Sequence, residues 1–451
     1  MLRAPAILLL LLSLLPAPVG AAAPAADCLT LEQAVRLALR EDPDMREADA
    51  RLMAARGARQ RAAVVVPSNP ELAATLATDR PFAGSGEREL AIELTQEFFA
   101  PGQRQARIAM ADAGFAAAEA DRAWAARQVA ADTAVAYVQT SAAIRKLADV
   151  ESLLLLLGRL DASAARREGA GEISSFERNQ VLLDTGMAQA ELARVSEEAS
   201  LARQSLELRT GLVLEPTALL MRLEPVSWPD VEALAAGASL AERPEIEAAM
   251  HRRESAESLL RVEKRERRPR PSLILGWRSD RGTVLGDDFR GLPFPADDIS
   301  IRDRDEVLII GFGLSIPIFD RNRGGITEAI AEGALADAAL VRATRAARAD
   351  VSRLLTQGRL LSRAHAAVAD APAAAATNLA VLERAADGGQ LGLADILRER
   401  ERIQRARLAT EDVTTAYLET QLQLAAALGG LELFGIDLAA LDRARVEEVA
   451  P

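Results

Sequence analysis

Side chains that could bind a transition metal or act as a nucleophile are scarce in this chain of 451 residues. Cys28, His251 and His365 are its only cysteine and histidine residues. Their spacing matches no ligand pattern, and a tetrahedral zinc site needs about four donors. The sequence also has no glycine-rich phosphate loop and no nucleophile motif. It therefore predicts no catalytic residue, no cofactor and no resident metal site.

The composition points away from nucleic acids and towards closely packed helices. The formal net charge is −12 and the sequence pI is about 5.0, which is unfavourable for binding a polyanion. Aromatic residues make up only 3% of the chain, which is low for a protein with a large globular core. Alanine is abundant, and small side chains allow helices to approach each other closely.

The N-terminus predicts an exported protein. Residues 1–23 have the features of a signal peptide, with Arg3 before the apolar run Ile7–Leu15. This run is shorter than the roughly 20 residues of a membrane-spanning helix. Cys28 is either lipid-modified or a free thiol, and the preceding Asp27 favours the free thiol. No later stretch has the length of a membrane helix, so the mature chain is expected outside the cytoplasm, either soluble or inserted as strands.

The same order of elements occurs twice along the chain. After Pro43-Asp44, and again after Pro244-Glu245, the pattern predicts a helix, two strands, a long helix, a glycine-marked turn and another long helix. Such a duplication determines the architecture before any motif does. The predicted organisation is a signal peptide (1–23), a first repeat (24–211), an irregular proline-containing equatorial segment (212–241), a second repeat (242–428) and a C-terminal tail (429–451).

Alternation of apolar and polar residues predicts four strands, each with one apolar face. The predicted strands are Glu71–Thr78, Arg88–Phe98, Ser272–Arg278 and Glu306–Ile316. Their lengths are close to those of tilted membrane strands. Seven of the ten phenylalanines lie in or beside them, as the aromatic girdles of a membrane barrel require. A small water-exposed sheet with a phenylalanine-rich core is the alternative. The segment Asp280–Asp305 is predicted to be a solvated loop.

Long helices follow each pair of strands. Alanines at alternating spacings of three and four predict one continuous helix from Gln103 to Arg167, roughly 100 Å long at about 1.5 Å per residue. Glycines 169 and 171 are predicted to end the first long run, and Gly388-Gly389 the second. A helix of this length suits a coiled coil or a tunnel and not a compact domain.

Four strands per chain predict an oligomer. Open sheet edges in lipid leave backbone groups unpaired, which costs several kcal/mol for each group. Two chains would give eight strands whose side chains fill the barrel, whereas three chains would give twelve strands around a lumen. The predicted fold class is thus mainly α with a membrane β-barrel portion. Long antiparallel coiled-coil helices form an α-barrel, and each chain contributes four strands to a trimeric twelve-stranded β-barrel.

Two segments carry a resemblance to a known family. They are Leu29–Leu39 (LTLEQAVRLAL) and Ile316–Gly325 (IPIFDRNRGG). Together with the duplicated order, they resemble the TolC-type outer-membrane efflux proteins across nearly all of the mature chain. The second segment is most similar to the CzcC-type branch for heavy-metal cations. The resemblance implies a homotrimer with its barrel in the outer membrane and its helical tunnel in the periplasm. It also implies docking to a periplasmic adaptor and to an inner-membrane pump, which is expected to be proton-driven.

The resemblance also implies the functional positions. The glycine-marked turns correspond to the periplasmic tips of the family. Asp395 falls on the acidic aperture position, Glu177 lies at the equivalent place in the first repeat, and Arg398 stands where a second acidic residue is common. An acidic ring favours cations electrostatically. The residues expected to contact the adaptor are Gly171, Ile173, Phe176, Gly389, Leu391 and Leu393.

The expected function is that of an outer-membrane channel subunit of a tripartite efflux system, a passive duct for heavy-metal cations. One alternative is a soluble periplasmic coiled-coil adaptor. Such adaptors have a single helical hairpin between β domains, whereas this chain has two copies of the strand–helix unit. A second alternative is an outer-membrane duct for drugs or other small molecules. The sequence leaves the cargo undecided.

Overall fold

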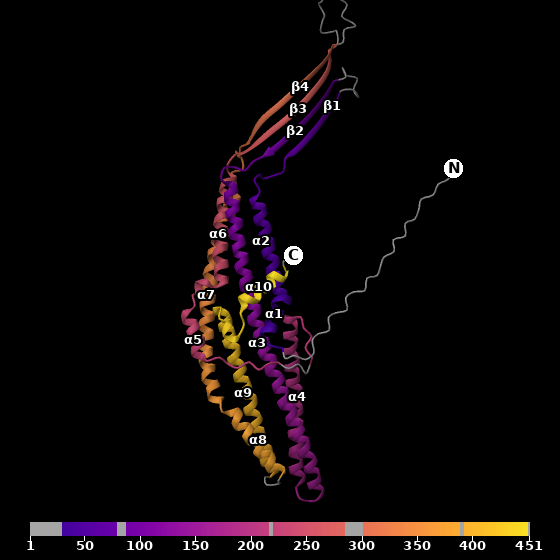
Figure 1. Ribbon diagram of the computed structural model, residues 1–451, viewed down its shortest axis with the longest axis vertical. Coiled ribbons are helices and arrows are strands. Elements are labelled where there is room, and N and C mark those ends of the chain that lie inside the picture. Colours follow the sequence, from indigo (N-terminus) through magenta and orange to yellow (C-terminus); the bar gives the residue numbers. More distant parts are fainter. Residues whose placement is uncertain (1–28, 79–86, 216–219, 285–300, 388–391, 450–451) are drawn as a thin grey trace, which may run out of the picture.

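The computed structural model describes residues 29–78, 87–215, 220–284, 301–387 and 392–449. A sheet occupies one end of an elongated molecule, and helices make up the rest (Figure 1). The predicted signal peptide and Cys28 lie outside the described residues. Within them, none of the helices combines the length and the apolar character that crossing a membrane requires.

The first half of the chain contributes four main helices, α1 (Leu31–Glu41), α2 (Pro43–Ala63), α3 (Gln103–Gly169) and α4 (Ser175–Thr210). The expected long helix is confirmed, since α3 runs without a break for 67 residues. The α1 helix begins with a capping box. The Thr30 hydroxyl accepts a hydrogen bond from the backbone N–H of Gln33 at 3.2 Å, and the Gln33 side chain accepts one from the N–H of Thr30 at 3.0 Å.

The second half contributes α6 (Pro244–Glu266), α7 (Arg323–Val368), α8 (Ala371–Asp387) and α9 (Leu393–Leu428). The helical run before Gly388 was expected to be continuous, and this prediction was wrong. The run breaks between α7 and α8, because Pro372 cannot donate a backbone hydrogen bond and its ring would clash with the carbonyl of Val368.

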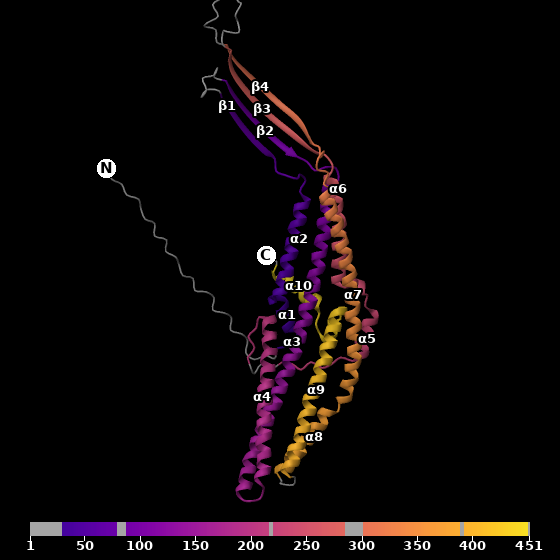
Figure 2. The same cartoon turned by 180° about the vertical axis from the view of Figure 1, so that it is seen from behind.

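Two smaller units pack around the middle of the molecule. The segment 212–241, predicted to be irregular, contains the helix α5 (Trp228–Gly237). After α9 the chain forms α10 (Leu438–Val449), which returns beside α1 and α2 (Figures 1 and 2). Arg445 of α10 contacts Asp49 of α2 at 2.6 Å, and Asp442 accepts two hydrogen bonds from Arg122 of α3 at 2.6 and 2.8 Å. The last helix is thereby fixed to the first long helix.

The four strands form one antiparallel sheet in the order β1-β2-β3-β4. Their bounds are β1 (Glu71–Thr78), β2 (Arg88–Glu97), β3 (Arg270–Val284) and β4 (Ile301–Ser315). The central pairing, β2 with β3, joins the two copies of the repeat. The sheet lies at the far end of the molecule from the α3–α4 turn (Figure 1).

The hairpin of β3 and β4 is longer than predicted. Each strand has 15 residues, and the two ends of the expected loop Asp280–Asp305, residues 280–284 and 301–305, are paired strand instead. Asp280 lies opposite Asp305, and Val284 lies opposite Ile301. Charged residues occupy both faces of this stretch, so the apolar alternation that predicts a strand is lost while the backbone pairing continues. The remaining loop residues, together with Phe82, Phe289 and Phe294, lie outside the described residues.

A glycine in α7 accommodates the packing of α5. Trp228 of α5 is buried with Tyr417 and Leu424 of α9, and a Cβ atom at Gly358 would overlap its six-membered ring. Glycine is therefore needed here for space. The structure thus assigns a packing role to a residue that otherwise weakens a helix.

We expect Gly358→Ala to destabilise the protein by about 2 kcal/mol, because Trp228 must shift from a packed site. The measurement is the apparent melting temperature of the protein in detergent. Gly333→Ala is the matched control, since no atom lies within 4 Å of a Cβ placed there on the same helix. Adding Trp228→Phe removes the overlapping ring atoms and should reduce the penalty. An equal penalty in both backgrounds would contradict the packing explanation.

Candidate functional site

One face of the sheet is apolar and exposed in the single chain. Directly paired residues share a face, and the register places Leu76 beside Leu90, Ile92 beside Trp277, and Trp277 beside Leu308. This apolar face consists of Leu72, Ala74, Leu76, Leu90, Ile92, Leu94, Leu273, Leu275, Trp277, Leu308, Ile310, Phe312 and Leu314. Its leucines, isoleucines and Phe312 are 38–73% exposed, which is unusual for a folded surface in water. The predicted one-sided sets are confirmed by the register.

The opposite face, called here the polar face, has smaller and more polar side chains. It includes Glu93, Thr95 and three glycines of β3 and β4, at positions 276, 311 and 313. Glu89 forms an ion pair with Arg278 of the neighbouring strand at 2.9 Å. A sheet with one face of this kind and one exposed apolar face can separate water from lipid.

The outer edges of the sheet are available for pairing. Within the described strands, β1 pairs only with β2, and β4 pairs only with β3. An exposed strand edge presents a row of backbone N–H and C=O groups to another strand. A single chain therefore leaves one strand edge unpaired on each side of its sheet.

The α3–α4 turn lies at the other end of the molecule (Figure 1). The backbone of Gly171 has φ +75°, a left-handed conformation that favours glycine. The N–H of Gly171 donates to the carbonyl of Glu168 at 2.9 Å, and the N–H of Glu172 donates to that of Arg167 at 2.8 Å. This is the hydrogen-bond pattern of a Schellman cap, which fixes the sharp reversal.

The expected aperture residue Glu177 lies in the first turn of α4, where it caps the helix. Its carboxylate accepts a hydrogen bond from the Ser174 N–H at 2.9 Å and from the Ser174 hydroxyl at 3.0 Å. These two bonds lower the pKa of Glu177, so the exposed carboxylate remains ionised to lower pH. One of its oxygens is committed to the cap.

The other expected tip residues differ in exposure. Ile173 is partly buried against the apolar cluster described below, whereas Phe176 is 69% exposed. Leu393 is the first residue of α9. Gly389 and Leu391 lie outside the described residues. Phe176 is thus the described apolar side chain that the tip presents most openly.

Asp395 lies in the first turn of α9. Arg398 lies one turn further, and its Nη1 is 3.5 Å from Oδ1 of Asp395. Both side chains are largely exposed, so this contact contributes little to stability. It does place a positive charge beside the carboxylate within the same chain. The predicted aperture position therefore carries a partly compensated negative charge.

An apolar cluster joins the two hairpins near the tip. It includes Leu157 of α3, Val181 of α4 and Leu397 of α9. Beside it, a groove of about 420 Å³ lies between α3, α4 and α9. Burial, together with the negative charge of Glu401, raises the pKa of Asp184 in this groove. The hairpins are held together by apolar contacts with acidic groups at their margin.

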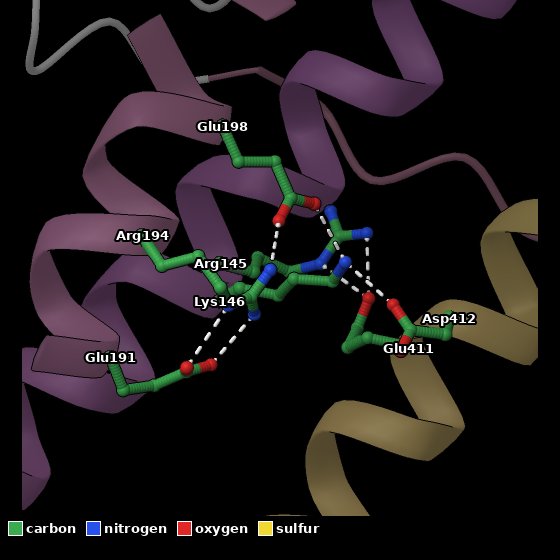
Figure 3. A network of polar contacts seen from close by, with 7 residues as sticks. All are labelled: Arg145, Lys146, Glu191, Arg194, Glu198, Glu411 and Asp412. Carbon is green, nitrogen blue, oxygen red and sulfur yellow. Dashed lines mark hydrogen bonds and ion pairs between the residues drawn. The ribbon is translucent and has the colours of Figure 1, made fainter. Parts of the chain in front are cut away.

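Further from the tip, Lys146 of α3 links three helices (Figure 3). Its Nζ lies 2.8 Å from Glu198 Oε1 of α4 and 2.6 Å from Asp412 Oδ1 of α9. Burial by itself lowers the pKa of Lys146, but the hydrogen bonds to both carboxylates outweigh it and the pKa is raised. The ammonium group is therefore charged at neutral pH and connects the two hairpins.

Further ion pairs surround Lys146. Arg145 Nη2 lies 3.0 Å from Glu411 Oε2, which adds a second link between α3 and α9. Arg194 bridges Glu191 at 2.6 Å and Glu198 at 3.2 Å along α4 (Figure 3). We refer to these seven residues, Lys146 and its two partners included, as the Lys146 network. Sequence reasoning missed it. The one available signal was that Lys146 is one of only two lysines in the chain.

The described ranges contain no group of three or more histidine, cysteine, aspartate or glutamate side chains that could hold a metal ion. The two histidines have structural neighbours. The ring of His365 lies 5.1 Å from that of Tyr417, and His251 Nδ1 lies 3.6 Å from a carboxylate oxygen of Glu254.

Residues 235–430 match the family model described as "Outer membrane efflux protein". The "Nickel-cobalt-cadmium resistance protein NccC" of Alcaligenes xylosoxydans xylosoxydans is 26% identical over 283 residues, which cover 60% of this chain and 58% of that protein. The "Nickel and cobalt resistance protein CnrC" of Cupriavidus metallidurans is 28% identical over 258 residues, covering 57% and 56%. The chain thus spans less than two thirds of the length of these relatives.

Solved structures resemble the chain over most of its length. The CmeC outer membrane channel of Campylobacter jejuni has a TM-score of 0.70 at 16% identity, covering 93% of this chain and 90% of that one. CusC has a TM-score of 0.67 at 17% identity, covering 89% and 92%. The expected fold class, mainly helical with four antiparallel strands in each chain, is confirmed.

Proposed function

We infer that this chain is a member of the outer membrane efflux protein family and the outer-membrane channel subunit of a tripartite efflux system. The supporting observation is the sheet, with its exposed apolar face, its polar opposite face and its two open edges. Such a sheet is stable in lipid only when its edges are paired. Helices of the length of α3 continue the duct below the membrane.

A homotrimer would pair the backbone groups of the two open edges. The β4 edge of one chain pairs with the β1 edge of the next, and three chains close a twelve-stranded barrel around a lumen. From Leu308 to Ile316, just past β4, the exposed apolar residues cover roughly 26 Å along the chain, close to the ~25 Å apolar band of outer-membrane barrels. The barrel lies in the outer membrane, and the helices form an α-barrel in the periplasm.

The helical end is the docking end. The α3–α4 turn and the start of α9 face the periplasm, where an adaptor and an inner-membrane pump, expected to be proton-driven, deliver the cargo. Gly171, Ile173 and Phe176 are the proposed contacts in the first turn, with Gly389, Leu391 and Leu393 in the second. The rigid cap at Gly171 and the exposed ring of Phe176 support this assignment.

The proposed cargo is a heavy-metal cation. The curated relatives are named for resistance to nickel, cobalt and cadmium. The polar face of the sheet adds a row of acidic positions, Glu89, Asp280 and Asp305, which lie directly opposite one another on adjacent strands. The duct itself selects weakly, through negative potential along its lumen and at Asp395, and the pump supplies the specificity.

The function is tested by deleting the gene and measuring growth on nickel, cobalt, cadmium, zinc, copper and a panel of organic drugs. We expect sensitivity to divalent metals that the wild-type gene reverses, with unchanged drug tolerance. Sensitivity to drugs alone would assign the duct to organic cargo. Recovery of the protein from the periplasm without detergent would favour an adaptor instead.

Asp395→Asn should reduce the cation selectivity of the channel roughly twofold, because three carboxylates leave one ring. Arg398→Gln should have the opposite effect, since it removes the compensating charge 3.5 Å away. The measurement is the reversal potential of single channels in a planar bilayer under a salt gradient. Selectivity that is unchanged in both variants would remove these residues from the conduction path.

A further inference from the structure

Three arginines form a row across the sheet. The register pairs Arg88 of β2 with Arg281 of β3, and Arg281 with Arg304 of β4. Directly paired residues have Cβ atoms about 4.5–5.5 Å apart and point to the same face. All three side chains are exposed. We call this set the arginine row.

The arginine row lies on the apolar face. Side chains alternate between faces with a period of two, so Arg88 shares a face with Leu90, Arg281 with Trp277, and Arg304 with Leu308. One row of residues, Leu90, Ser279 and Glu306, separates the arginines from the fully apolar rows. The arginine row therefore marks the end of the apolar face that is farther from the helices (Figure 1).

The positive charges of this row are poorly compensated. Arg304 forms an ion pair with Glu306, while Arg88 and Arg281 have no ion-pair partner among the described residues. Each arginine has an acidic residue next to it in the sequence, namely Glu89, Asp280 and Asp305. Because side chains alternate between faces, these carboxylates point to the polar face. Like charges directly opposite each other in a sheet are destabilising. A bound anion would relieve this repulsion.

We propose that the arginine row binds the phosphate of an anionic lipid in the outer leaflet. This inference rests on the proposed function, because that function places the apolar face in lipid. A lipid whose acyl chains lie against Trp277 and Leu308 would have its head group beside Arg281 and Arg304. Arginine binds phosphate oxygens with two parallel hydrogen bonds, and a cation at a membrane surface attracts anionic lipids.

The position of the row favours a lipid over a freely diffusing anion. Arg281 lies four residues beyond Trp277 on one strand, about 13 Å along the chain. At the ~45° tilt of a membrane strand this is about 9 Å along the bilayer normal, enough to cross the interfacial layer of roughly 5–7 Å on one side of the bilayer. The alternation also keeps all three guanidinium groups away from the lumen, so the row cannot act on the cargo.

The test uses Trp277 as a reporter of the lipid beside the row. The chain has three tryptophans, and Trp124 and Trp228 lie on helices. In the background Trp124→Phe with Trp228→Phe, the trimer is reconstituted in mixed vesicles of phosphatidylcholine and phosphatidic acid. One lipid at a time carries brominated acyl chains, and the quenching of Trp277 gives the relative affinity of the two lipids.

We expect phosphatidic acid to be preferred about fivefold over phosphatidylcholine. Replacing Arg88, Arg281 and Arg304 together by glutamine should reduce the preference to about onefold, while replacing them by lysine should retain most of it. Glutamine at Arg342, Arg345 and Arg348 is the control that removes three exposed charges from α7 and should leave the preference unchanged.

The remaining outcomes separate the two proposals. Equal quenching by both brominated lipids in the parent protein would overturn the lipid site while leaving the membrane placement intact. No quenching by either lipid would overturn the membrane placement and the site with it. A preference that excess inorganic phosphate abolishes would overturn the assignment to a lipid, because free phosphate would then occupy the row.

Discussion

Replacing Ile310 by arginine is expected to remove the protein from the outer membrane. Ile310 lies near the middle of the apolar face and is 71% exposed in the single chain. An arginine on the lipid face at the bilayer midplane costs about 2–4 kcal/mol per chain, so the proposed trimer would lose roughly 6–12 kcal/mol. The measurements are the amount of protein in the outer-membrane fraction and the loss of metal tolerance.

Ile309 provides the matched control on the same strand. It is the preceding residue, so its side chain points to the polar face, and it is paired with Gly276. An arginine there would extend over Gly276 of β3 towards Glu93 of β2, the residue paired with that glycine. We expect Ile309→Arg to insert normally and to change conductance only. If the two variants behaved alike, or if Ile310→Arg remained in the membrane, the orientation of the sheet would be wrong.

The parts of the fold that depend on near neighbours were predictable. The uninterrupted α3 and the strand β1 were found because their signals lie within a few residues of one another. The outer part of the β3–β4 hairpin was missed, because Asp280 and Arg281 put charges on both faces and its pairing depends on a strand some 20 residues away. The break before Pro372 was available from the sequence, since proline interrupts a helix.

The candidate sites were likewise predictable where their contacts are local in sequence, and not where they join distant parts of the chain. The capping role of Glu177 could have been recognised, because serine at position 174 and glutamate three residues later form a capping box. The Lys146 network could not have been recognised from the sequence, because its contacts join residues 52 and 266 positions apart in the chain. Likewise, the arginine row becomes visible only once the register aligns three strands from both halves of the chain.

The Lys146 network has a consequence for the duct. It crosses from the first hairpin to the second, so it opposes any separation of α9 from α3 and α4 at a level above the tip. The apolar cluster below it opposes the same movement by packing. A tip that opens must therefore bend below the network or break it, and the strength of the network sets which of these is easier.

Lys146→Met is expected to weaken this connection by about 3 kcal/mol. Removing one member of a buried ion pair costs about 3–5 kcal/mol, and no more than the lower end applies here because the Asp412 side chain is 61% exposed and screened by solvent. The measurement is hydrogen exchange of the backbone amides of α9 around Asp412. Local opening that is 3 kcal/mol easier accelerates their exchange by roughly 100-fold.

The other lysine is the matched control. Lys264 of α6 is exposed, so Lys264→Met removes the same charge without breaking a buried contact and should leave exchange in α9 unchanged. The sign of the pH dependence is fixed by the raised pKa of Lys146. Its stabilisation is complete below the ordinary value of 10.5 and is lost as the pH rises through the higher folded value. Exchange in α9 that is equally fast in both variants would show that packing alone holds the hairpins together.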